Sequence, residues 1–155
     1  MQHRRLIAAA LALSFASAYA ADTPTAAPAR RTVADRLADA RKAIEAKDWN
    51  VALRELNTAA REEPNNADVH NLLGYSWRKR SNPDVTKAFE HYYTALRIDP
   101  RHKGAHEYIG QAYLMEKRPQ QAETHLAELE KICGGQSCPE YQELAKAIAD
   151  FKAGR

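Results

Sequence analysis

Small and large apolar residues alternate along most of this chain at the spacing of an α-helix. Leu73, Gly74 and Trp77 follow one another at steps of one and three, and Ala88 precedes Tyr92 by four. Both spacings place the apolar residues on one face of a helix. Strong helix formers dominate the composition, and runs of β-branched residues are absent. The pattern predicts an all-α protein.

The pattern of a helix pair occurs three times. Residues 70–100 align with residues 106–134, and residues 36–64 fit the same frame. The aligned pairs are His70 with His106, Leu73 with Ile109, Gly74 with Gly110, Trp77 with Tyr113, Ala88 with Ala122 and Tyr92 with Leu126. A unit of about 34 to 36 residues that repeats in register indicates a solenoid, because each unit covers its apolar face only with a neighbour.

Residues that favour helix ends separate the expected helices. Pro64 and Pro100 close the second helix of the first two copies, since proline cannot continue a helix. Asp48 and Asn82 are expected to cap the second helices of these copies, and Pro119 is expected to open that of the third.

These residues resemble the tetratricopeptide repeat, which has Leu-Gly-x2-Tyr in its first helix and Ala-x3-Phe, Ala and Pro in its second. The middle copy matches best, through LGYSW and AFEHY. The first copy departs most, because Arg36 and Asp39 stand where large apolar residues are usual. The resemblance implies an α-solenoid of three antiparallel helix pairs. The expected repeats are residues 33–66, 67–102 and 103–136.

A further amphipathic stretch follows the third repeat. It begins at Pro139 and is expected to form a helix over about residues 139–153 that caps the solenoid; a helix displayed in solution for a partner is the alternative. Its apolar stripe consists of Tyr141, Leu144, Ala145, Ile148 and Phe151.

Both cysteines of the chain lie in the sequence CGGQSC, between the third repeat and the cap. Gly134 occupies the place that Pro64 and Pro100 hold in the other copies. In an oxidising compartment, a disulfide between Cys133 and Cys138 would restrain this turn in place of proline. The spacing differs from that of a Cys-x-x-Cys redox motif. No His follows the second cysteine, as covalent haem attachment would require. We expect a structural disulfide, with a regulatory thiol pair as the alternative.

The first twenty residues have the pattern of a secretory signal peptide. A basic start precedes an apolar run and a small-x-small ending, which predicts cleavage after Ala20 and a periplasmic or secreted protein. Residues 21–31 are rich in Ala and Pro and are expected to be a disordered lead-in to a domain over residues 32–155. No later apolar run is long enough to span a bilayer, so we expect no stable membrane insertion after cleavage.

The charge of the chain does not indicate a nucleic-acid partner. The formal net charge is +3, and the leader contributes Arg4 and Arg5 without an acidic residue. A nucleic-acid footprint would need a clustered excess of Lys and Arg. The basic run at residues 78–80 is interpreted as a solvated turn.

The resemblance implies a non-enzymatic module that binds a protein or peptide in a groove along the first helices, without a cofactor. The oligomeric state is not predicted. One subclass of the family clamps a terminal carboxylate with Lys, Asn and Arg, but Leu37, Leu72, Gly104 and Tyr108 stand at those positions, so we do not expect such clamping. The groove positions carried over from the family are Arg41, Asp68, Asn71, Tyr75, Arg78, Glu107, Gln111 and Leu114.

A thiol-redox or metal-binding protein is the alternative function. Cys133 and Cys138 would supply the redox pair, and His102 and His106, four apart on a helix, could bind one metal ion. No third ligand is evident, and His106 aligns with His70, which favours packing for both. His91 and His125 recur on second helices with no partner that the sequence identifies. Of the aromatic residues, Trp77, Tyr92 and Tyr113 fall on core positions, and Tyr75, Tyr93 and Tyr108 are candidates for a binding surface.

Overall fold

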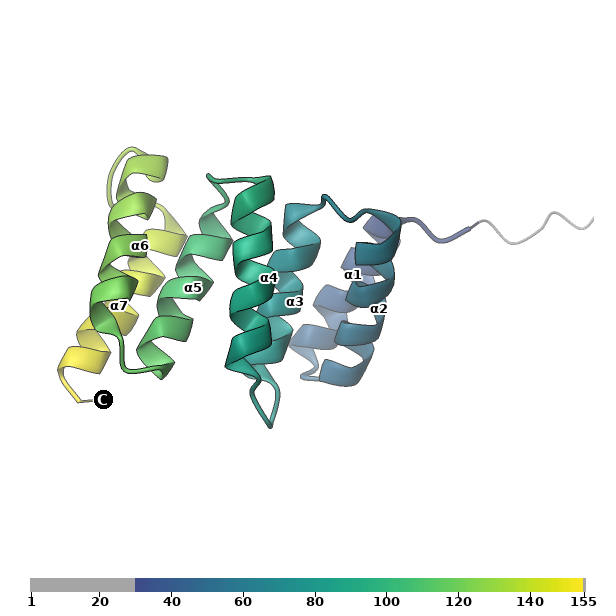
Figure 1. Ribbon diagram of the computed structural model, residues 1–155, viewed down its shortest axis with the longest axis horizontal. Helices are drawn as coiled ribbons and strands as arrows, with labels where there is room; N and C mark the ends of the chain where they lie inside the picture. The colour runs from purple at the N-terminus through teal and green to yellow at the C-terminus, as the bar shows by residue number, and fades with distance from the viewer. Residues whose placement is uncertain (1–29, 155) are drawn as a thin grey trace, which may run out of the picture. The chain divides into compact units, whose positions relative to one another are not determined.

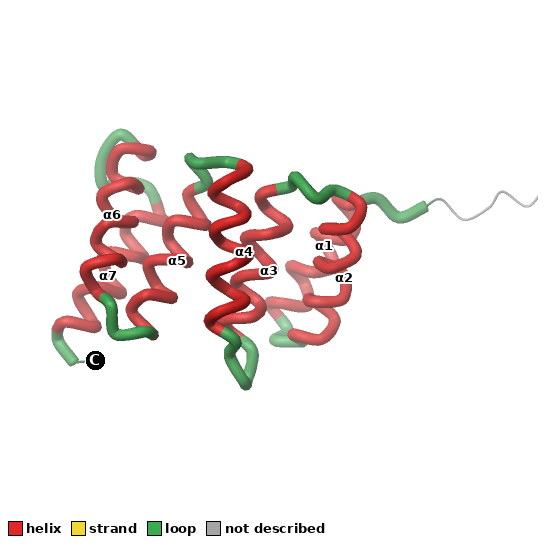
Figure 2. Tube along the Cα trace, in the orientation of Figure 1, coloured by secondary structure: helices red, strands yellow, loops and turns green. Residues whose placement is uncertain are grey.

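The computed structural model describes residues 30–154, in which every regular element is an α-helix (Figure 2). The predicted signal peptide and nearly all of the predicted lead-in lie outside this range. Within it, no helix is long and apolar enough to cross a membrane. The helices are α1 (Val33–Glu45), α2 (Trp49–Glu62), α3 (Ala67–Lys79), α4 (Val85–Ile98), α5 (Lys103–Met115), α6 (Pro119–Cys133) and α7 (Pro139–Lys152).

The helices pack as consecutive pairs in chain order (Figure 1). α1 packs on α2, α3 on α4 and α5 on α6, and each pair also contacts the next through α2 with α3 and α4 with α5. α7 lies against both α5 and α6. The predicted fold class, an all-α solenoid of three helix pairs with a C-terminal capping helix, is therefore confirmed.

Aspartates cap the second helices of the first two repeats, and Pro119 opens that of the third, as predicted. Asp48 caps α2 and accepts a hydrogen bond from the Val51 amide at 3.0 Å, as predicted. The prediction that Asn82 caps α4 is wrong, because the cap is Asp84, which accepts from the Lys87 amide at 3.0 Å. A carboxylate two residues further on satisfies the free amides of the first turn equally well.

Two glycines allow the helices to approach closely. A Cβ on Gly74 would lie 2.6 Å from the ring of Tyr92, inside the α3–α4 pair. A Cβ on Gly110 would lie 2.5 Å from Leu144 of the cap. Both distances are far below van der Waals contact, so the small residue of the repeat is required at both positions.

Ion pairs replace apolar contacts in the divergent first repeat. Arg36 of α1 donates to Glu62 of α2 at 2.9 Å and to the buried Glu55 at 3.3 Å. Arg31 pairs with Asp39 and also lies 3.2 Å from Glu55. These contacts explain how Arg36 and Asp39 are accommodated where large apolar residues are usual.

A disulfide joins Cys133, the last residue of α6, to Cys138, the N-cap of α7. This is the bond that the sequence predicts. Gly134 ends α6 in the left-handed conformation, with φ of 69°, which favours glycine. The bond therefore closes the turn that brings the cap back onto the third repeat.

Removal of the Cys133–Cys138 disulfide is expected to destabilise the folded protein. The double variant Cys133→Ser/Cys138→Ser is expected to lose about 2 kcal/mol of unfolding free energy, because the unfolded chain regains the freedom of a short loop. Its amide hydrogens should exchange faster in α7 than in the wild type, with little change in α1. Urea unfolding and hydrogen exchange measure both. An unchanged midpoint, in the variant or in the reduced wild type, would contradict this role.

Candidate functional site

Asp68 connects the first helices of all three repeats. Its carboxylate lies 3.9 Å from the Arg41 guanidinium of α1 and 3.1 Å from Nε2 of His102. His102 is the N-cap of α5, and its Nδ1 accepts a hydrogen bond from the Ala105 amide at 3.1 Å. Two of the predicted groove residues, Arg41 and Asp68, therefore lie together on one face.

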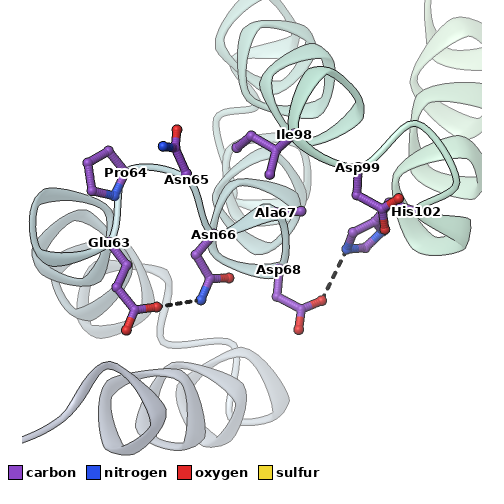
Figure 3. Close-up of a pocket in the computed structure, with 9 residues that line it drawn as sticks. All are labelled: Glu63, Pro64, Asn65, Asn66, Ala67, Asp68, Ile98, Asp99 and His102. Carbon is purple, nitrogen blue, oxygen red and sulfur yellow. Dashed lines mark hydrogen bonds and ion pairs between the residues drawn. The ribbon is translucent and has the colours of Figure 1, made fainter.

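An open hollow of about 600 Å³ lies beside Asp68, where the α2–α3 and α4–α5 turns come together. Figure 3 shows Asp68 directed toward His102 in this hollow, and Asn66 bonded to Glu63. Most of its lining is polar or acidic. The lining residues are Glu63, Pro64, Asn65, Asn66, Ala67, Asp68, Ile98, Asp99 and His102.

An arginine in the last turn of α3 packs against two tyrosines that contact each other. The Arg78 guanidinium carbon is 5.5 Å from the ring centroids of both Tyr75 and Tyr108, and the two rings are 4.8 Å apart. Nε of Arg78 donates to the Tyr92 hydroxyl at 3.2 Å. Because Arg78 is only 5% exposed, the interpretation of residues 78–80 as a solvated turn is wrong for this residue.

Two further hollows lie on either side of this Tyr75–Arg78–Tyr108 cluster. One, of about 580 Å³, contains Tyr75 and Trp49, whose rings are 6.4 Å apart. The other, of about 310 Å³, is bounded by α3, α5 and α7 and is largely apolar. Its lining residues are Arg78, Gln111, Leu114, Met115, Ala147 and Phe151. Sequence reasoning missed the contributions of Trp49 and the cap, because both come from outside the first helices.

Glu107 is a buried carboxyl beside this cluster. Burial raises its pKa from 4.5 to about 7, and the charges of Glu140 and Glu143 on α7 act in the same direction. The charge of Arg78 and a hydrogen bond of 2.8 Å from Gln111 oppose the shift only in part. The carboxyl is therefore part protonated near neutral pH.

Two buried oxygens, one on α3 and one on α7, have no hydrogen-bond partner among the residues that the structure describes. They are Oδ1 of Asn71, whose residue is 6% exposed, and Oε2 of Glu140. A buried acceptor without a donor costs free energy. A bound group that brings N–H donors would remove that cost once the side chain turns toward it.

The histidines pair in a way that the sequence analysis did not predict. Nδ1 of His70 lies 3.3 Å from Nδ1 of His91, and Nδ1 of His106 lies 3.0 Å from Nδ1 of His125. Burial, together with the partner histidine, lowers the pKa of both His91 and His125 from 6.5 to about 4. The recurrence of each histidine at one repeat position was the signal that could have revealed the pairs.

His102 and His106, which the sequence offered as an alternative metal-binding pair, bond to different partners. His102 bonds to Asp68 and the Ala105 amide, whereas His106 faces His125 and the Pro100 carbonyl. Over residues 30–154 no group of three or more His, Cys, Asp or Glu side chains could hold a metal ion. Tyr93, the other surface candidate, is 46% exposed on α4 and bonds to Tyr113, away from Tyr75.

No known family model matches the chain, and no curated protein resembles it significantly in sequence. Solved structures do resemble it. The TPR2B domain of yeast Sti1, in its complex with pHsp70, superimposes with a TM-score of 0.69 over 79% of this chain and 98% of that chain, at 14% identity. The chain has a tetratricopeptide-repeat-like fold.

A second solved structure of this TPR-like fold is SycD, the type III secretion translocator chaperone of Yersinia enterocolitica. The TM-score is 0.65 over 79% of this chain and 89% of that chain, at 13% identity. At such identities the likeness shows the fold. The site therefore has to be argued from this chain's own residues.

The raised pKa of Glu107 predicts a stability that falls as pH rises. Between about pH 4.5 and pH 7 the folded state binds more protons than the unfolded state, so unfolding becomes easier as pH increases. The variant Glu107→Gln should be more stable than the wild type by roughly 1–2 kcal/mol at pH 8, after allowance for screening by water, and by less at pH 5.

Urea unfolding at both pH values measures this difference. Glu90→Gln on α4 is the matched control, because Glu90 is exposed, and it should show no comparable change between pH 5 and pH 8. An equal effect of Glu107→Gln at the two pH values would contradict the assignment.

Proposed function

We propose that this chain is an exported, non-enzymatic protein-interaction module that binds a peptide or an extended segment of a partner protein along its first helices. The binding face consists of α1, α3 and α5, and α7 closes one end. The Tyr75–Arg78–Tyr108 cluster, with a hollow on either side, carries the proposal. Aromatic residues and arginine supply much of the binding energy at protein interfaces.

The polar groups of this face suit a polypeptide backbone. Oδ1 of Asn71 is buried without a donor, and a rotation of the side chain on binding would let a peptide N–H satisfy it. The apolar hollow at Leu114 and Phe151 could hold a side chain of the same segment. Alternating polar and apolar subsites are characteristic of the recognition of extended peptides.

The structural neighbours are consistent with this proposal. One was solved as a complex with pHsp70, and the other is named a translocator chaperone. We do not extend either partner to this chain. Leu37, Leu72 and Gly104 replace the polar set that would clamp a terminal carboxylate, so an internal segment of the partner is the better candidate.

Export is proposed from two features of the chain. Residues 1–20 have the pattern of a secretory leader. The bond between Cys133 and Cys138 suits an oxidising compartment such as the periplasm. We therefore propose that the partner is an exported protein as well.

A photocrosslinker at Tyr75 tests the proposed face directly. The full chain, with p-benzoylphenylalanine at position 75, is expressed in the source cells, and the same probe at Tyr93 on α4 is the matched control. We expect position 75 to capture a discrete protein in the exported fraction, and position 93 to capture none. Equal capture from both positions, or capture from position 93 alone, would refute the assignment of the face.

The crosslinked segment, identified by mass spectrometry, then serves as a ligand for affinity measurements. Asn71→Ala should weaken its binding at least tenfold, because the amide contact is lost, whereas Asn57→Ala on the exposed side of α2 should leave it unchanged. Circular dichroism verifies that both variants remain folded. Equal affinities would show that Asn71 does not contact the partner.

A further inference from the structure

The helices α5 and α7 lie side by side and run in the same direction. They pack at Gly110 of α5, where an added Cβ would meet Leu144 of α7. Glu107, one turn before Gly110, interacts with Glu140, one turn before Leu144, whereas residues after both line a common hollow. The groove between them, the α5–α7 groove, therefore has one end at the helix starts and the other at the helix ends.

The end of the α5–α7 groove at the helix starts is acidic. Glu107 is 9% exposed, and the charges of Glu140 and Glu143 act on it from α7. Oε2 of Glu140 is buried and has no hydrogen-bond partner among the described residues. Arg78 of α3 offsets this charge only in part, because its Nε is bonded to the Tyr92 hydroxyl. Three carboxyls near one arginine leave an excess of negative charge, which a cation from a partner would neutralise.

The other end of the groove is the apolar hollow of about 310 Å³ between α3, α5 and α7. Met115 lines it and is 46% exposed. Gln111 also lines it and donates to Glu107 at 2.8 Å, so the hollow continues into the acidic end. An exposed apolar side chain beside a concave apolar lining suits an apolar side chain of a partner. The remaining lining residues are Arg78, Leu114, Ala147 and Phe151.

The length of the groove sets the spacing of the groups that it can accept. Leu114 and Met115 follow Glu107 by seven and eight residues. At about 1.5 Å per helical residue, the two ends are roughly 10–12 Å apart along α5. An extended segment advances about 3.3 Å per residue, so this distance corresponds to three or four residues of a bound segment.

We propose that the α5–α7 groove binds a segment of the partner in which a lysine or arginine stands three or four residues from a large apolar residue. This inference rests on the binding face proposed above and specifies the class of segment that the face accepts. The basic side chain lies against Glu140 and Glu143, and it supplies a donor to Oε2 of Glu140 once that carboxylate turns toward it. The apolar side chain fills the hollow at Met115.

Glu107 gives this binding a pH dependence. Its pKa is raised to about 7 by burial and by Glu140 and Glu143 on α7, and Arg78 on α3 opposes the shift. Tyr108, beside it, has a pKa of about 12 and stays protonated. A bound cation favours the charged form of Glu107, so a basic segment binds more tightly at pH 8 than at pH 6.

Selection of random peptides displayed on phage, with the full chain as bait, tests the proposal. We expect the selected peptides to carry Lys or Arg three or four positions from Leu, Ile, Phe or Met. One of them is then synthesised with lysine and with norleucine, an uncharged analogue, at the basic position. Norleucine should weaken binding to the wild type at least tenfold, but binding to Glu140→Gln/Glu143→Gln only about twofold.

The double variant Glu90→Gln/Glu130→Gln is the matched control. It removes two charges from exposed positions of α4 and α6 and should keep the full preference for lysine. From pH 6 to pH 8 the lysine peptide should bind the wild type several-fold more tightly, and Glu107→Gln should abolish this gain. Circular dichroism verifies that each variant is folded.

The remaining outcomes separate this inference from the proposed function. If Asn71→Ala weakens the selected peptides but lysine and norleucine bind equally well, or if the lysine preference persists in Glu140→Gln/Glu143→Gln, this inference is wrong and the proposed face stands. If the wild type selects no peptide, or if Asn71→Ala has no effect on any selected peptide, the proposed face fails and this inference fails with it.

Discussion

Each helix pair of this chain can cover its apolar face only with the next pair, and the rest of the structure depends on this constraint. The helices must approach closely, which explains why Gly74 lies under the ring of Tyr92 and Gly110 under Leu144. Among the described residues, α7 takes the place of a further repeat and covers the third one. The disulfide at Cys133 then limits how far α7 can separate from α6.

Close packing also explains the character of the proposed binding face. When the first helices are held together, polar residues on their shared side lose contact with water. Asn71, Arg78 and Glu107 are each less than a tenth exposed. Arg78 is compensated by two aromatic rings and a hydroxyl, whereas Asn71 and Glu107 are compensated less well, and this imbalance is what a ligand could correct. Buried polar groups that are incompletely satisfied are more typical of binding sites than of structural cores.

Much of the fold could be predicted from the sequence, because repetition shows which positions share an environment. The three helix pairs, the cap and the bond at Cys133 were all predicted. What could not be predicted depends on side-chain contacts across helices. The basic run at residues 78–80 does not reveal that Arg78 turns inward to Tyr92, and the carboxylate that caps α4 is Asp84, although Asn82 is as good a cap in isolation. The histidine pairs likewise require the register of one helix against another.

The central claim is that the first helices, and not the second, carry the binding function. Amide chemical shifts of the full ¹⁵N-labelled chain, recorded as the captured partner segment is added, test it most directly. The account predicts that the largest shifts map to α3 and α5, around Tyr75 and Glu107, and extend to the facing side of α7. Shifts confined to α2, α4 and α6 would contradict it.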